Sequence, residues 1–148
     1  RSFAAVLGGD GSVAVYEVQC GGGELSLHQS LSVPGGQAFD IDTWHLDPYQ
    51  YLAAAASGGL AVWRWDAGGL RFEAAGGVPP GIPASTVRAF GGYLAVGRSV
   101  RPPSSLPLGG FGVYSWDGEA LAEVQNVTLG GDTVQMEHAR VEGAFGQG

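Results

Sequence analysis

The stretch LAVWRWDAGGLRF, from Leu60 to Phe72, decides the fold of this chain. Its first six residues, from Leu60 to Trp65, form a mostly apolar run that is interpreted as a strand of period two, and Asp66 then leads into a Gly-containing turn. A period of two places alternate side chains on opposite faces of a β-strand, and Asp and Gly between two such runs favour a hairpin. FGVYSWDGEALAEV at Phe111 repeats the pattern, and VAVYEVQCGGGELSL at Val13 is a weaker version. The sequence therefore predicts one strand-turn-strand unit three times.

The repeat has a regular period. Its aromatic anchors, Tyr16, Trp63 and Tyr114, are 47 and 51 residues apart. We predict three further strands around each anchor, which gives twelve strands starting at Phe3, Val13, Glu24, Ala38, Tyr51, Leu60, Leu70, Ala84, Tyr93, Phe111, Ala120 and Gly131. Four antiparallel strands in every ~40–50 residues are typical of β-propeller blades. The alternative is a β-sandwich built from hairpins, in which such a period is rare.

The predicted domain is an all-β array of propeller blades. The blades span residues 1–37, 38–83 and 84–130, and residues 131–148 start a further blade. Propellers close with about 4–8 blades, so three blades form only part of a ring. The chain also lacks an initiator Met and opens within a predicted strand. We therefore expect a fragment of a larger protein, with the remaining blades in the same parent chain.

Composition limits the classes of partner. Apolar residues make up 45% of the chain, which is enough for a core, whereas charged residues make up only 14%. The net charge is -7 and no basic stripe is present, which argues against nucleic acid and anionic membrane as partners. No apolar run reaches the ~20 residues of a membrane-spanning helix, so we expect no membrane insertion. The single cysteine, Cys20, is either a free thiol or paired outside this chain.

These motifs resemble the epilepsy-associated repeat, also called EAR or EPTP. That family has a YLAVA strand followed by a strand of the form I/V-Y-x-W-D. Tyr51-Leu52-Ala53 and Trp63-Arg64-Trp65-Asp66 match it in one copy, and Tyr93-Leu94-Ala95-Val96 and Tyr114-Ser115-Trp116-Asp117 match it in the next. The resemblance covers nearly the whole chain, although the first copy lacks the Trp-Asp pair and the third carries the insertion VRPPSSLPLGG.

The resemblance implies a function as well as a fold. EAR proteins resemble seven-bladed propellers on secreted or cell-surface proteins, bind other extracellular proteins and are not enzymes. We therefore expect a non-catalytic protein-interaction module that is extracellular or at the cell surface. The alternatives are a carbohydrate-binding, lectin-like propeller, for which the Trp side chains would form a platform, and a structural subunit of a large extracellular assembly. The structural repeat motif comprises Tyr16, Trp63, Trp65, Asp66, Tyr114, Trp116 and Asp117.

Two sequence features belong to the predicted extracellular surface. Asn126-Val127-Thr128 is a sequon for N-glycosylation and follows the outermost strand of its blade. The segment RPPSSLP, residues 101–107, interrupts a blade between two strands. Proline favours extended structure outside sheets, so this loop is a binding loop, an O-glycosylated patch or an insertion without function.

The strands at Ala38, Ala84 and Gly131 are predicted to line a central channel. Asp42, Arg88 and Gln135 occupy equivalent positions in them and should point into the same space. Carboxylates there, with Asp40 nearby, would suit Ca²⁺, which prefers oxygen ligands, but the mixed charge argues against a strong site. The three histidines lie at unrelated positions, so zinc is not expected. We otherwise expect no cofactor and no catalytic residue.

Overall fold

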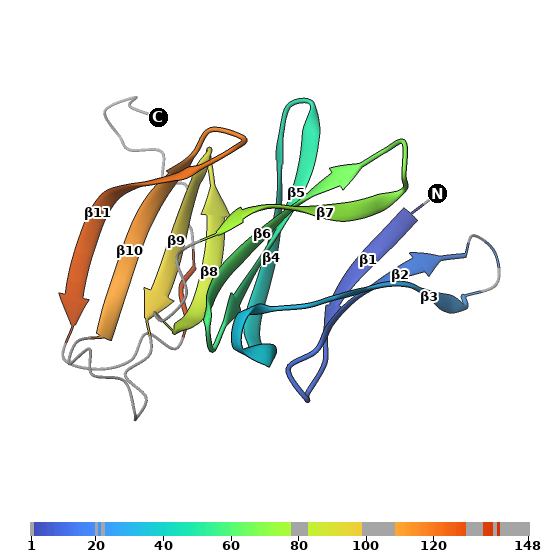
Figure 1. Ribbon diagram of the computed structural model, residues 1–148, viewed down its shortest axis with the longest axis horizontal. Helices are drawn as coiled ribbons and strands as arrows, with labels where there is room; N and C mark the ends of the chain where they lie inside the picture. Colours follow the sequence, from blue (N-terminus) through green and yellow to red (C-terminus); the bar gives the residue numbers. More distant parts are fainter. Residues whose placement is uncertain are drawn as a thin grey trace.

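The computed structural model describes residues 2–19, 21, 23–77, 83–98, 109–129, 135–137 and 139. These residues form three antiparallel sheets, which lie side by side in Figure 1. Sheet I contains β1 (Ser2–Leu7), β2 (Val13–Val18) and β3 (Leu25–Leu31). Sheet II contains β4 (Ala38–Leu46), β5 (Tyr49–Ala56), β6 (Gly59–Asp66) and β7 (Arg71–Gly77). Sheet III contains β8 (Ala84–Phe90), β9 (Tyr93–Arg98), β10 (Gly109–Trp116) and β11 (Leu121–Leu129).

The all-β prediction is confirmed, and each sheet is an antiparallel meander in which neighbours in sequence are neighbours in space. A short 3₁₀ turn, Pro34–Gly36, connects sheets I and II. Of the twelfth predicted strand, residues 131–134 lie outside the described residues, and residues 135–137 are not in a strand. A strand needs a hydrogen-bonded neighbour, and none of the described strands pairs with this segment. Within the described residues, no helix is long and apolar enough to cross a membrane.

A recurring β-bulge shows that the three sheets are structural repeats. In sheet I, the register between β2 and β3 shifts at Val15/Tyr16. The equivalent shifts are at Val62/Trp63 between β6 and β7 of sheet II and at Val113/Tyr114 between β10 and β11 of sheet III. A bulge inserts one residue into one strand and bends it, so its position is a specific structural marker. The bulge immediately precedes each aromatic anchor, which fixes equivalent positions in the three sheets.

Sheet II is buried on both faces. The side chains of Tyr51, Ala53 and Ala55 belong to the core shared with sheet III. Leu52 and Ala54 on the same strand belong to the core shared with sheet I. A strand covered on both sides gains nothing from polar alternation, which explains the unbroken apolar run in YLAAAA. The middle sheet is therefore enclosed by its two neighbours, in a blade-like stack.

Each of the two cores contains an aromatic contact, and the two contacts join equivalent positions of the repeat. Phe3 on β1 packs against Trp65 on β6, with ring centroids 4.7 Å apart. Tyr51 on β5 packs against Trp116 on β10 at 5.6 Å. Registers place Phe3 and Tyr51 at the same position of successive sheets, and likewise Trp65 and Trp116. Each interface between sheets is thus built on the same contact.

Candidate functional site

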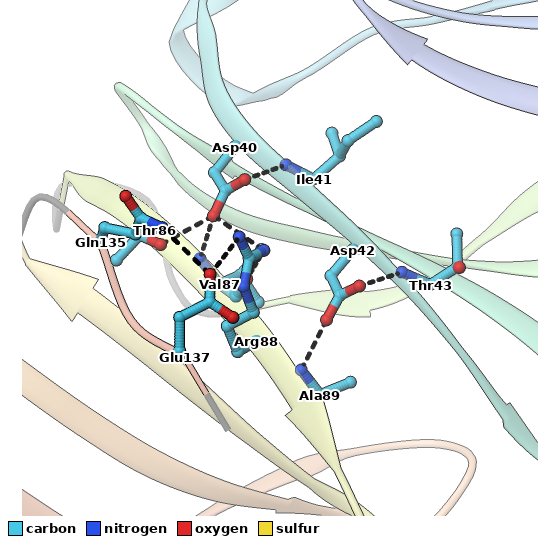
Figure 2. A network of polar contacts seen from close by, with 10 residues as sticks. All are labelled: Asp40, Ile41, Asp42, Thr43, Thr86, Val87, Arg88, Ala89, Gln135 and Glu137. Atoms are coloured by element: carbon cyan, nitrogen blue, oxygen red, sulfur yellow. Dashed lines mark hydrogen bonds and ion pairs between the residues drawn. The ribbon is translucent and has the colours of Figure 1, made fainter. Parts of the chain in front are cut away.

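A carboxylate clasp, formed by Asp40 and Asp42 of β4, joins sheet II to sheet III (Figure 2). Asp40 Oδ2 accepts hydrogen bonds from Thr86 Oγ1 at 2.7 Å and from the Val87 backbone N–H at 3.0 Å. Its Oδ1 accepts from the N–H of Ile41 at 3.0 Å. Thr86 and Val87 are buried, so this carboxylate satisfies donors that water does not reach.

Asp42 repeats the same geometry two residues further along β4. Its Oδ2 accepts from the Ala89 N–H at 2.8 Å and its Oδ1 from the Thr43 N–H at 2.9 Å. β8 is an edge strand that pairs with β9 on one side only. Free N–H groups on a sheet edge invite pairing with another chain, and charged acceptors close that edge. The clasp therefore holds two sheets together and occupies one edge of β8.

Arg88 and Gln135, the other predicted channel residues, extend this network. Arg88 Nη1 lies 3.4 Å from Asp40 Oδ2 and donates to the Val87 carbonyl at 3.0 Å. Its Nη2 lies 3.9 Å from Glu137 Oε1, which accepts from Gln135 Nε2 at 3.0 Å. The structure thus brings Arg88 close to Asp40 and links Gln135 to Arg88 through Glu137, whereas Asp42 bonds the backbone of Ala89. A closed channel is not shown, and channel lining stays a prediction.

The four oxygens of Asp40 and Asp42 all accept hydrogen bonds from protein donors. Among the described residues, no three His, Cys, Asp or Glu side chains gather in a way that could hold a metal ion. Calcium binding stays a prediction, which now requires a cation to compete with these protein donors.

The Asp of the repeat motif organises a hairpin turn. Asp66 accepts hydrogen bonds from the N–H groups of Gly68 and Gly69, each at 3.1 Å. Asp117 Oδ1 accepts from those of Glu119 and Ala120, each at 2.8 Å. The Ala120 and Glu119 hydrogen bonds hold the pKa of Asp117 below its usual value. Such Asx turns are local structure, so these motif residues shape the blade-like hairpins.

The motif aromatics lie in or beside the sheet interfaces. Trp63 and Trp116 are buried, and Trp65 is half-buried against Phe3 and Phe72. Burial raises the pKa of the Tyr114 hydroxyl, and the nearby Glu123 carboxylate raises it further. Tyr16 is half-buried on β2.

A hollow of about 640 Å³ lies beside the β4–β5 turn and extends to the β6–β7 turn. We call it the Tyr49 hollow, after a Tyr that is 41% exposed. The Arg64 guanidinium lies 4.5 Å from the centre of the Tyr49 ring, in a cation–π contact. Trp65, His45 and Glu73 also line the hollow. It therefore combines aromatic surface with both signs of charge.

Sequence reasoning did not identify Tyr49 or Arg64 as surface residues of interest. The hairpin register could have indicated their contact. Tyr51 pairs with Arg64 across β5 and β6, so Tyr49, two residues before Tyr51, is the diagonal neighbour of Arg64. It also missed Gln29, whose side-chain amide exchanges two hydrogen bonds of 2.8 Å with the backbone of Phe72. That contact joins sheets I and II and depends on how two sheets are placed, which strand periodicity does not encode.

Asn126 of the sequon lies within the exposed strand β11, so the prediction that the sequon follows the outermost strand is wrong. Its Oδ1 accepts a hydrogen bond from Arg98 Nη2 at 2.8 Å. The same nitrogen donates to the carbonyl of Val127 at 3.0 Å. The sequon is therefore on the surface, and its glycosylation stays a prediction. Cys20 and the segment RPPSSLP lie outside the described residues.

No protein-family model and no curated protein sequence matches this chain.

Proposed function

We propose that this chain is part of an EAR-like β-propeller that acts as a non-catalytic protein-binding module of a secreted or cell-surface glycoprotein. Three repeated sheets with a shared bulge and a shared inter-sheet aromatic contact support the propeller reading. The remaining blades would belong to the same parent chain. The partner is an extracellular or cell-surface protein.

The Tyr49 hollow is the observation that carries the proposal. Tyr, Trp and Arg dominate the binding energy of protein interfaces, and Tyr49, Trp65 and Arg64 are grouped here. The cation–π contact holds the Arg64 side chain in place before a partner arrives, which lowers the entropy cost of binding. Asp66 and Glu73 at the rim supply acceptors for a polar or basic partner surface.

A binding screen tests this proposal. The 148-residue chain is applied to an array of recombinant extracellular domains and, in parallel, to a glycan array. We expect saturable binding to at least one protein, and we expect Arg64→Ala to weaken it at least tenfold, as is typical of a central interface residue.

Arg71→Ala is the matched control, because Arg71 is an exposed Arg on β7 that does not line the Tyr49 hollow. It should bind like the wild-type chain. Equal losses in the two variants, or protein binding unaffected by Arg64→Ala, would remove the hollow from the proposal. Saturable binding to glycans alone would refute protein binding.

Sugar binding is the second candidate, and the same hollow favours it. Trp65 stands there with Gln50, Asp66 and Glu73, and an aromatic face beside amide and carboxylate groups suits a sugar ring. Protein binding is preferred because Phe3 and Phe72 already pack against the Trp65 ring. The glycan array separates the two candidates directly.

A further inference from the structure

Sheet II splits into two hairpins at one end. The ladder between β5 and β6 ends with the pair Tyr51–Arg64. The β4–β5 ladder continues for two further pairs beyond this point, and so does the β6–β7 ladder. Figure 1 shows these two hairpins pointing in different directions beyond the shared part of the sheet. The Tyr49 hollow is lined by residues of both hairpins, so it lies in this split.

Sheet III has the same repeat without the longer hairpin. The pair Tyr93–Ser115 is equivalent to Tyr51–Arg64, because Arg64 and Ser115 each follow the aromatic anchor of their sheet. β8 and β9 turn immediately beyond this pair, through residues 91–92. The projecting part of the β4–β5 hairpin is therefore an addition to sheet II. Loops that a rigid scaffold holds in place often carry binding residues, and this addition brings Tyr49 to the hollow.

The charges around the Tyr49 hollow favour a cation. Of the residues that line it, Arg64 carries a positive charge, and Asp66 and Glu73 carry negative charges. Asp47 adds a third carboxylate beside the hollow, where it contacts the lining residue His45. The whole chain has a net charge of -7. A surface of net negative charge attracts basic groups and accelerates their association.

Glu73 is the carboxylate that is available to such a cation. Arg64 and Glu73 lie directly opposite each other on β6 and β7, where side chains of opposite charge normally pair. Neither side chain, however, forms a hydrogen bond or an ion pair with another described residue. The Tyr49 ring holds the Arg64 guanidinium in the cation–π contact, and the Asp66 carboxylate accepts two N–H groups of its own turn. The exposed Glu73 carboxylate is thus left open.

We propose that the Tyr49 hollow receives a basic side chain, Lys or Arg, from a loop of the partner protein that enters between the two hairpins of sheet II. Glu73 pairs with the cation, and Arg64 donates its free N–H groups to carbonyl oxygens of the same loop. The hollow of about 640 Å³ is in the size range of small-ligand sites, which suits one side chain with part of its loop. This inference rests on the proposed protein-binding function and adds the chemistry of the partner.

Short peptides test the charge preference without an identified partner. Three acetylated and amidated pentapeptides carry Arg, Lys or Glu at the centre of a frame of Gly and Ser. NMR titration of the 148-residue chain follows the amides of Gln50 and Gly68 and the indole N–H of Trp65, which line the hollow. We expect saturable shifts with the Arg and Lys peptides that weaken as salt is added, and no saturable shift with the Glu peptide.

Substitutions at Glu73 assign the contact. Glu73→Gln should raise the Kd of the Arg peptide about two- to fivefold, as is typical of a solvent-exposed ion pair, and Glu73→Lys should raise it further. Tyr49→Leu should also raise it, because the released Arg64 can then pair with Glu73. Glu24→Gln is the matched control, since it removes the same charge at an exposed position outside the hollow, and its Kd should equal that of the wild-type chain. Far-UV circular dichroism establishes that each variant is folded.

Three results would overturn the inference: no saturable shift with either basic peptide, equal binding of the Glu peptide, or the same Kd in Glu73→Gln as in the wild-type chain. If the protein array nevertheless gives a partner that Arg64→Ala weakens, the proposed function stands and only the basic chemistry of the partner is refuted. If the basic peptides bind as expected but no extracellular protein does, the charge preference of the hollow stands and the proposed function fails.

Discussion

The interface between sheets II and III and the interface between sheets I and II start from the same repeat and are joined differently. Asp40 and Asp42 close the first along the strands β4 and β8, where Trp44 also stacks on Tyr51. Among the described residues, the second has no such strand on the sheet I side, and a hollow of about 340 Å³ lies among Phe3, Trp65 and Phe72. Gln29 joins it instead at the outer strands.

This difference shows that a first strand does more than complete a sheet. It contributes large side chains that fill the space between sheets and acceptors that satisfy the edge of the next sheet. Where it is missing, aromatic packing persists but part of the space stays open. We therefore expect the interface between sheets II and III to be the more sensitive to substitution.

The largest expected effect comes from truncating equivalent core residues in the two interfaces. Leu94 and Leu52 occupy the same position in sheets III and II, and each is 0% exposed. Leu94→Ala should lower the free energy of unfolding by about 2–5 kcal/mol, because it leaves a cavity in a closed core. Leu52→Ala should cost less, because three-stranded sheet I can shift to fill the space. Urea denaturation of both variants measures the difference, and an equal or greater loss for Leu52→Ala would contradict the comparison.

The next effect concerns the carboxylate clasp. Asp40→Ala should cost about 1–3 kcal/mol, because the donors of Thr86 and Val87 are left buried without their acceptor. Asp40→Asn keeps an acceptor oxygen and should lose less. Thermal unfolding monitored by circular dichroism compares the two variants, and equal losses would show that the charge, not the acceptor, matters.

A smaller effect is expected where Gln29 joins sheets I and II. Gln29→Ala removes two neutral hydrogen bonds at a partly buried position, so a cost of about 1 kcal/mol is expected. Gln29→Glu is the sharper variant, since a carboxylate retains the acceptor for the Phe72 N–H but cannot donate to its carbonyl at neutral pH. Hydrogen exchange at the Phe72 amide should then change less in Gln29→Glu than in Gln29→Ala. The reverse order would contradict this assignment.

Much of the fold could be predicted from sequence because period-two alternation and the Asp-containing turns are local signals. They located the strands of all three sheets, and the anchors Tyr16, Trp63 and Tyr114 coincide with the recurring bulge. The inter-sheet contacts were harder to predict. The hydrogen bond that the Asp42 carboxylate accepts from the Ala89 N–H of the neighbouring sheet was not predicted, whereas channel lining by Asp42 stays a prediction. Pairing of Tyr49 with Arg64, and of Gln29 with Phe72, depends on turn geometry and sheet placement, which alternation does not specify.

The smallest effect is a pH dependence at the turn of Asp117, which lies beside the closed interface, near the Tyr51 hydroxyl. Hydrogen bonds from Ala120 and Glu119 lower the pKa of this Asp below 3.8, so the folded state binds the proton less readily than the unfolded state. Its contribution is therefore fully present above pH 3.8 and is lost as the pH falls through the lowered folded value. Asp117→Asn should remove this contribution, so it should lower stability slightly at neutral pH, leave stability near pH 2 almost unchanged and flatten the acid limb of stability against pH. Thermal midpoints measured from pH 2 to pH 7 test this, and an unchanged acid limb would show that the Asp117 turn does not contribute to acid unfolding.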